Sequence, residues 1–202
     1  MNPMSTERFL KILPNICNQE TSADPEQWKS QNPLWGHCAI VSLVAQNVFG
    51  GKLLRASLEN TPFAFMRSHY VNQLPGGEIV DFTKDQFEKE YPPLQFEERN
   101  RFYVLSHVET KRRYKKLAFR FAQVMSRDNP LFKNEKYQAC FYEALDSGCQ
   151  KLWVGCILVQ DGKIVSQGHN NPVKELEHIC QPKCIRFGIQ SRTESMIGAC
   201  AH

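Results

Sequence analysis

The amino-acid sequence predicts an α+β fold arranged in two consecutive units. The first unit combines a strongly apolar helical pattern at residues 38–49 with short strand-like runs and a glycine-rich turn between residues 53 and 82. The second unit begins near residue 135 with a helical pattern, followed by two strand-like runs that an Asp-Gly pair joins. The chain has 202 residues, of which 42% are hydrophobic, a size and composition that suit one medium domain or two small ones.

The elements of the first unit follow from periodicity and turn residues. A short apolar helical turn near Phe9 comes first. The helix at 38–49 keeps its apolar residues at helical spacing until Gly50-Gly51, because helix C-termini favour glycine. The predicted strands are 53–58, 67–74 and 78–82, and the last two form a hairpin around Pro75-Gly76-Gly77. Residues 109–127 predict a basic amphipathic helix, whose charged face we interpret as solvated surface.

The second unit is predicted to hold a helix at 135–147 and a hairpin with strands at 152–159 and 164–169. The remainder, from Asn170, is loop-like and rich in Cys and His. We therefore expect domains at 1–127 and 135–202, joined by a polar linker at 128–134. We interpret Cys140, Cys149 and Cys156 as small core residues.

Composition excludes several classes of protein. The net charge of +4, from 25 basic and 21 acidic residues, is too weak to argue for nucleic acid, and no nucleic-acid-binding motif accompanies it. No run approaches the roughly 18 apolar residues of a membrane span, and no secretory signal is visible. We therefore expect a cytoplasmic protein without a membrane partner. In that compartment its eight cysteines favour free thiols, metal ligands or a nucleophile over disulfides.

Cys38, His69 and Asp81 form the first candidate site. Cys38 stands at a predicted helix start, where the helix dipole stabilises a thiolate, and a nearby imidazole can accept its proton. His69 and Asp81 lie on the two strands of the hairpin. They face each other if the loop is the five residues 73–77, whereas a two-residue Gly76-Gly77 turn places Asn72 opposite Asp81. In the first case Asp81 orients the ring of His69; the alternative is a packed cysteine with an unrelated histidine.

Four residues before Cys38 are candidates for substrate contact. Gln31 or Asn32 could donate a hydrogen bond to an oxyanion, or simply form a turn before Pro33. Gly36 would let a substrate approach the backbone closely. Trp35 offers an aromatic platform, although packing is the commoner role of such a residue.

A family resemblance covers about residues 25–122. The runs Asn32-Pro-Leu-Trp-Gly-His-Cys-Ala-Ile-Val-Ser-Leu-Val-Ala-Gln, Ser68-His-Tyr-Val-Asn-Gln-Leu and Glu78-Ile-Val-Asp-Phe-Thr-Lys-Asp-Gln-Phe resemble the YunG-like family of papain-like proteins. The resemblance implies a papain-like domain with Cys38, His69 and Asp81 as its site, and it implies no substrate. His37 stands where many relatives would have Gln.

Residues 135–202 resemble the opening of zinc-dependent cytidine and deoxycytidylate deaminases. This resemblance rests on the run Val154-Gly-Cys-Ile-Leu-Val-Gln-Asp-Gly-Lys-Ile-Val-Ser-Gln-Gly-His-Asn-Asn-Pro and on the later Cys/His-rich run. The resemblance implies an α/β unit with His202 as first zinc ligand, and Asn170 as a contact to a nucleotide sugar. The expected Glu and Pro-Cys-x-x-Cys pair are absent, so this unit is incomplete, and we expect the natural chain to continue. His178, Cys180 and Cys184 are further candidate zinc ligands.

Three hypotheses about function follow. The first is a hydrolase or acyl-transfer enzyme that needs no cofactor and acts on an amide or thioester, with Cys38 as nucleophile and His69 as base. The second is a zinc-dependent nucleotide deaminase completed beyond His202. The third is a non-catalytic binding module on a papain-like scaffold. A protein, a peptide or a nucleotide is the expected partner or substrate.

Overall fold

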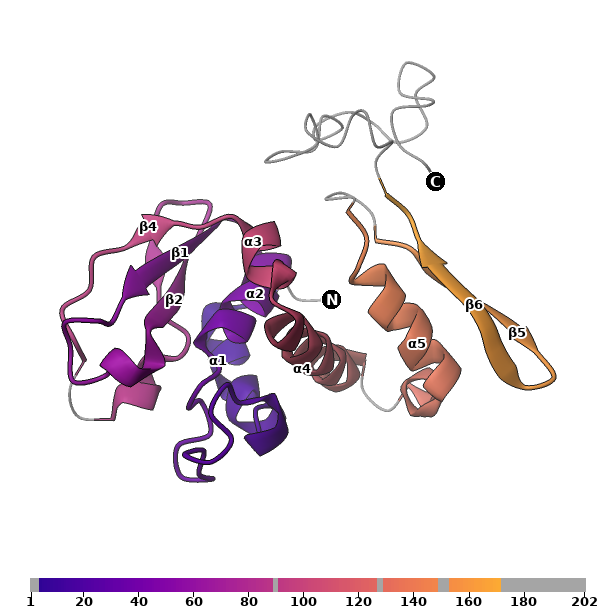
Figure 1. Cartoon of the computed structure of the whole chain (residues 1–202), viewed down its shortest axis with the longest axis horizontal. Helices are drawn as coiled ribbons and strands as arrows, with labels where there is room; N and C mark the ends of the chain where they lie inside the picture. Colours follow the sequence, from indigo (N-terminus) through magenta and orange to yellow (C-terminus); the bar gives the residue numbers. More distant parts are fainter. Residues whose placement is uncertain (1–3, 89–90, 127–128, 149–152, 172–202) are drawn as a thin grey trace, which may run out of the picture. The chain divides into compact units, whose positions relative to one another are not determined.

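The fold is α+β, with helices and antiparallel sheets, in a computed structural model that describes residues 4–88, 91–126, 129–148 and 153–171 (Figure 1). Contacts divide the chain into two compact units, Met1–Met125 and Ser126–His202. The domain boundaries expected from the sequence, and independent folding of either part, stay predictions. Each unit is described here by itself.

The first unit contains a four-stranded antiparallel sheet in the order β3-β2-β1-β4. Its strands are β1 (Lys52–Ser57), β2 (Ser68–Gln73), β3 (Ile79–Val80) and β4 (Glu97–Glu98). β1 and β2 pair along their whole length, with Ala56 opposite His69. This long pairing fixes the position of β2, the strand that carries His69.

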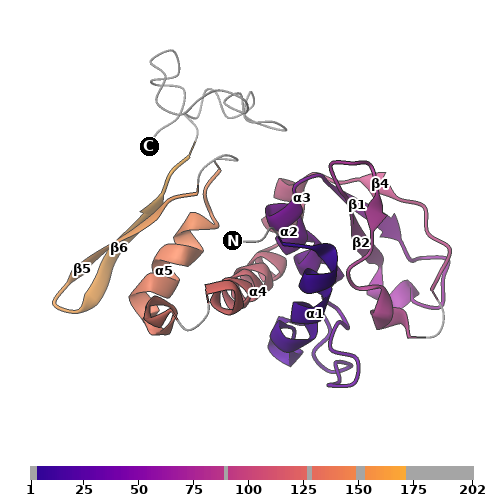
Figure 2. The same cartoon turned by 180° about the vertical axis from the view of Figure 1, so that it is seen from behind.

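Helices gather on one side of these strands (Figures 1 and 2). They are α1 (Thr6–Ile16), α2 (Cys38–Phe49), α3 (Arg101–Ser106) and α4 (Val108–Ser126). Three short 3-10 helices lie in the connections, at Gln19–Thr21, Ala64–Met66 and Lys84–Phe87. α2 packs against β2 and is buried over most of its length, as its nearly continuous apolar sequence requires. Gly50 ends it with a φ of +75°, a conformation that glycine adopts without strain.

Most elements of the first unit match the sequence prediction. The helix at 38–49 is confirmed at both ends, and the basic helix differs by one residue at each end. α3 and β4 were not predicted, because six and two residues are too short for either periodicity to register. β3 is only two residues long, so the predicted strand at 78–82 is wrong at its C-terminal end.

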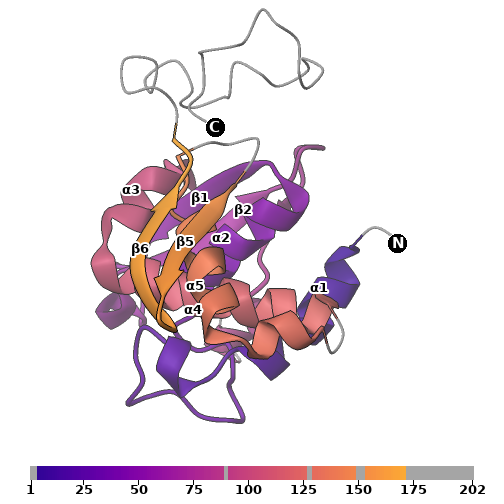
Figure 3. The same cartoon turned by 90° about the vertical axis from the view of Figure 1, so that its right-hand side faces the viewer.

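The second unit consists of the 3-10 helix Pro130–Lys133, helix α5 (Glu135–Ala144) and a hairpin of β5 (Gly155–Gln160) and β6 (Lys163–His169). α5 packs against the hairpin (Figure 3). The turn residues Asp161 and Gly162 both have positive φ, as a tight two-residue hairpin turn demands, so this part of the prediction is confirmed.

Both faces of that hairpin carry exposed apolar residues, namely Leu158, Val159, Ile164 and Val165. Cys156 is exposed and Cys140 is half-buried, so the expectation that they are core residues is wrong for Cys156. The apolar pattern is typical of strands that are covered on both faces, so the burial of Cys156 was overestimated. Cys149 lies outside the described residues.

Among the described helices, none combines the length and the apolar character that crossing a lipid bilayer would require.

The core of the first unit centres on Phe9, whose side chain is completely buried. Its ring lies 5.4 Å from that of Phe49, 4.9 Å from Phe82 and 5.3 Å from Phe121, all in edge or tilted arrangements that aromatic pairs favour. One ring on α1 therefore ties α2, the segment after β3 and α4 together.

We predict that Phe9→Ala lowers the free energy of unfolding by about 3–5 kcal/mol, the usual cost of deleting a fully buried ring. Urea denaturation followed by circular dichroism measures this. Leu10→Ala is the matched control, because Leu10 is the next residue on the same helix and is exposed. A similar loss of stability in both variants would contradict the assignment of Phe9 to the centre of the core.

Candidate functional site

The structure brings Cys38, His69 and Asp81 together in the first unit. Cys38 is the first residue of α2, His69 is the second residue of β2, and Asp81 follows β3 directly. The Cys38 Sγ lies 3.9 Å from the carbonyl oxygen of Ser68, the residue before His69. Cys38 is 7% exposed and His69 is fully buried, so both reacting groups lie at the edge of the core.

The imidazole of His69 is oriented by Asp81. The distance from Nε2 to the Asp81 Oδ2 is 2.7 Å. The carboxylate is itself held in place, because it accepts hydrogen bonds from the Thr83 amide and hydroxyl on Oδ1 and from the Tyr91 hydroxyl on Oδ2. Asp81 thus has a donor on each oxygen besides the histidine, which fixes the direction of the ring.

The contact between His69 and Asp81 does not depend on either of the two strand registers that the sequence suggested. β2 and β3 pair Asn72 with Val80 and Gln73 with Ile79, so neither expected partner of Asp81, His69 or Asn72, lies across the ladder from it. β3 ends at Val80, and Asp81 begins a turn by accepting the amide of Thr83, as Asp commonly does. The side chain reaches His69 from this turn and not from a strand.

The surroundings of His69 raise its pKa from the ordinary value of 6.5 to about 9. Burial lowers the pKa, but the hydrogen bond to Asp81, the hydrogen bond to Cys38 and the attraction of both negative charges outweigh burial.

Gln86 is a member of this site that sequence analysis missed. Its fully buried amide Nε2 lies 3.1 Å from the His69 Nδ1 and 3.1 Å from both the carbonyl and the hydroxyl of Thr83. Within the described residues its Oε1 has no hydrogen-bond partner. When Nδ1 accepts from this amide, the ring proton lies on Nε2 toward Asp81, which is the tautomer of a general base. When Nδ1 carries a proton, Gln86 can accept it only through Oε1, after its amide group has turned.

The four residues proposed for substrate contact have different surroundings. Gln31 is exposed. Asn32 donates its amide to the backbone oxygen of Gln86 at 3.0 Å and to the Glu88 carboxylate at 3.4 Å, so it joins the loop before Cys38 to the segment beside His69. Trp35 is half-buried and stacks on Phe65 at 6.0 Å, with its indole N–H on Asp24.

Gly36 serves chain packing, and its expected role in letting a substrate approach the backbone stays a prediction. It has a φ of +72°, and an added Cβ would lie 2.5 Å from the Ser22 Oγ and 2.9 Å from the Ala23 amide nitrogen. The space that a side chain would need is therefore filled by residues 22 and 23, and the tight turn there directs the chain into α2.

His37 is a neutral, buried anchor for the same turn. Its Nε2 lies 2.9 Å from the Thr21 hydroxyl and its Nδ1 lies 2.8 Å from the Trp35 carbonyl oxygen. Burial lowers its pKa to about 4, and the nearby Arg113 adds to this effect. His37 is the N-cap residue of α2 but caps no amide with its side chain.

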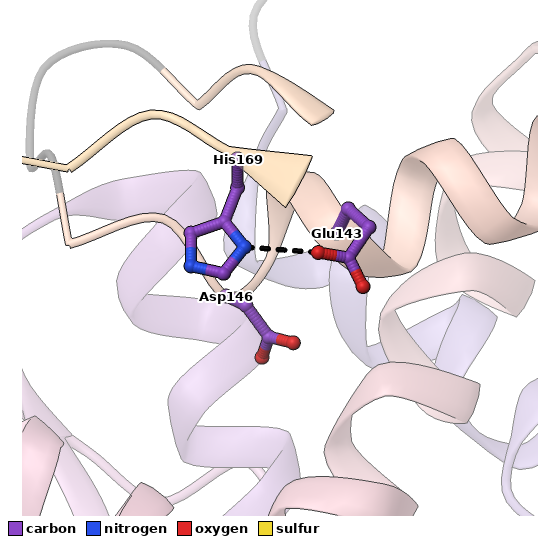
Figure 4. Close-up of side chains that lie close together, drawn as sticks. All are labelled: Glu143, Asp146 and His169. Carbon is purple, nitrogen blue, oxygen red and sulfur yellow. Dashed lines mark hydrogen bonds and ion pairs between the residues drawn. The ribbon is translucent and has the colours of Figure 1, made fainter. Parts of the chain in front are cut away.

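The second unit brings Glu143, Asp146 and His169 close together (Figure 4). Their ligand-type atoms all lie within 4.8 Å of one another, and the His169 Nδ1 is 2.9 Å from the Glu143 Oε2. These residue types suit a divalent metal, but His169 and Glu143 already share a hydrogen bond that ties β6 to α5. The predicted zinc ligands, His178, Cys180, Cys184 and His202, lie outside the described residues.

Asn170 has a structural role in the second unit. Its side-chain oxygen accepts hydrogen bonds from the Ser147 hydroxyl and from the Val154 amide, both at 2.8 Å. The expected contact of this residue with a nucleotide sugar stays a prediction.

Comparison with known proteins identifies relatives of the first unit. A family model described as YunG protein matches residues 5–126. The "Uncharacterized protein YunG" of Bacillus subtilis (strain 168) is 25% identical over 91 residues, which are 45% of this chain and 68% of that protein. No solved structure matches this chain. The family match ends before residue 135, so the resemblance of the second unit to deaminases has no support from it.

We predict that an NMR titration of His69 gives a pKa of about 9 and that Asp81→Asn lowers it, because the variant removes the negative charge and keeps the side-chain size. The folded pKa lies above the unfolded value, so the stabilisation is complete below about pH 6.5 and is lost as the pH rises through about 9. Tyr91→Phe is the control, since it removes one donor to Asp81 without changing charge. A pKa near 6.5 in the parent protein would refute the prediction.

Proposed function

The chain belongs to the YunG protein family, and from this premise we propose that its first unit is a cysteine-dependent hydrolase or acyl transferase acting on an amide or thioester. One observation carries the proposal. His69 bonds Asp81 through Nε2 at 2.7 Å and interacts with the thiol of Cys38, which begins helix α2. A nucleophile, a base and a group that orients the base are the parts that covalent acyl transfer needs.

The reaction begins with proton transfer. Because Asp81 occupies Nε2, Nδ1 is the ring nitrogen of His69 that takes the thiol proton of Cys38, and the Gln86 amide nitrogen, 3.1 Å from Nδ1, must then turn away. The thiolate attacks the carbonyl carbon of the substrate and forms an Sγ–C bond. His69 then returns the proton to the leaving nitrogen or sulfur as its bond to carbon breaks. Water or an acceptor amine attacks the resulting thioester, with His69 again taking the proton, and Cys38 is regenerated.

The N-terminus of α2 supplies the means of stabilising the oxyanion. The first amides of a helix have no partner within the helix, and the N-cap residue His37 caps none of them with its side chain. These donors and the helix dipole favour negative charge on a substrate bound to Cys38. Asn32 already donates to Gln86 and Glu88, so it acts on the oxyanion only if those bonds are exchanged.

A papain-like architecture of the first unit is part of the proposal. It is supported by a nucleophile at the start of a helix that packs on β2, and by a histidine on that antiparallel strand with an acidic partner beyond the next strand. A deaminase site in the second unit stays a prediction, because its proposed ligands lie outside the described residues.

We predict that p-nitrophenyl acetate, an activated acyl donor, acetylates Cys38 and that the adduct then hydrolyses. Intact-mass and peptide mass spectrometry measure both steps. His69→Ala should slow acetylation by about 100-fold or more, the usual contribution of a general base, and Cys38→Ala should abolish it at this site.

Cys156→Ala is the matched control, because Cys156 is an exposed cysteine of the second unit, and its removal should leave Cys38 acetylation unchanged. Equal acetylation of Cys38 in the parent and in His69→Ala would favour a non-catalytic binding module.

A further inference from the structure

Arg113, in the middle of α4, is a buried cation that forms no ion pair with any acidic residue that the structure describes. The residue is 9% exposed. Its guanidinium donates to the carbonyl oxygens of Thr21 and Gly36 at 3.3 and 3.4 Å and to the Thr110 hydroxyl at 3.4 Å. All three acceptors are uncharged, and the hydrogen bonds to them are long. In the part of the chain that the structure describes, no carboxylate lies within ion-pair distance of it.

This arrangement is costly unless a negative charge lies nearby. A buried cation loses its hydration, and three long hydrogen bonds to neutral oxygens replace that hydration poorly. The nearest acid on the helix, Glu109, instead binds the neighbouring Arg112 at 2.8 Å in an exposed position. Burial lowers the pKa of Arg113, while attraction to a thiolate at Cys38 is the largest effect that raises it.

The position of Arg113 connects it to the nucleophile. Gly36, whose carbonyl it contacts, comes two residues before Cys38, and Thr21 also binds His37 through its hydroxyl. The guanidinium therefore lies against the backbone of the turn that leads into α2.

We propose that Arg113 is a positioning residue that holds the turn before Cys38 through the Gly36 carbonyl oxygen and thereby places a positive charge that favours the thiolate form of Cys38. This inference rests on the proposed function of Cys38 as the nucleophile. It gives the buried guanidinium a counter-charge, namely the thiolate that the reaction requires.

The other charged and titratable groups around the thiol do not replace Arg113. They are His69 and Tyr70 on β2, Asp81 after β3, and His37 beside Cys38 itself. Asp81 disfavours a second negative charge, Tyr70 is an uncharged phenol because burial raises its pKa, and His37 is neutral because its pKa is lowered to about 4. His69 and Arg113 are therefore the two cations that stabilise the thiolate.

The test compares charge with shape at position 113. The rate of iodoacetamide labelling of Cys38 is measured against pH by mass spectrometry. Arg113→Gln retains hydrogen-bond donors and loses the charge, so its labelling midpoint should move up by about one pH unit, with about tenfold slower labelling at pH 6. Arg113→Lys retains the charge and should keep the midpoint near that of the parent. Arg112→Gln is the matched control and should change nothing.

A second measurement does not depend on how well an Arg113 variant folds. Iodoacetate is anionic, so a cation near the thiol should raise its rate relative to neutral iodoacetamide. The ratio at Cys38 should exceed the ratio at the exposed Cys156, and it should remain raised in His69→Ala, where Arg113 is the remaining cation.

Two results would overturn the inference. One is an unchanged midpoint in folded Arg113→Gln, and the other is an iodoacetate ratio in His69→Ala that falls to that of Cys156. Either result leaves the proposed function standing if the parent still forms an acetyl adduct at Cys38. Absence of that adduct would reject the proposed function, even with a raised iodoacetate ratio.

Discussion

The site depends on how the buried ring of His69 is held. Both ring nitrogens have partners, because Asp81 binds Nε2 and the Gln86 amide lies against Nδ1. Phe87 closes over the ring at 4.8 Å in an edge arrangement. Each of these residues comes from the segment directly after β3, so the position of that segment and the orientation of the imidazole determine each other. Asn32 extends the same constraint to the loop before Cys38 by binding the backbone of Gln86.

The charges of the groups around the thiol depend on their hydrogen-bond partners as much as on residue type. Two histidines are buried within the first unit, yet the pKa of His69 is raised to about 9 and that of His37 is lowered to about 4. The difference is the partner, since His69 meets a carboxylate and a thiol, whereas His37 meets a hydroxyl and a carbonyl oxygen. The neutral imidazole of His37 therefore holds the turn in place. In our proposal, Arg113 supplies the positive charge there.

Sequence reasoning singled out Cys38, His69 and Asp81, which the structure brings together, but it missed the residues that hold them in place. Cys38 was identifiable because a helix start is visible in the sequence, and His69 and Asp81 because they flank a recognisable turn. The strand register was wrong, since Asp81 acts from a turn that no alternation of apolar residues reveals. Gln86 and Arg113 gave no local signal. They reach the site only through tertiary packing, and Arg113 does so across 77 residues from Gly36.

A second buried cysteine in the first unit, Cys17, can be compared with Cys38. Cys17 is also buried, but it lies at the C-terminal end of α1, where its amide caps the helix by donating to the Leu13 carbonyl. Burial raises the pKa of the Cys17 thiol well above its ordinary value, and the helix end beside it carries negative partial charge. Such a cysteine is a small apolar side chain. Cys38 stands at the opposite, positive end of a helix, with an imidazole and a guanidinium near it. Burial alone therefore does not distinguish the two cysteines, whereas the helix end and the neighbouring cations do, and they are what supports the proposal that Cys38 is a nucleophile.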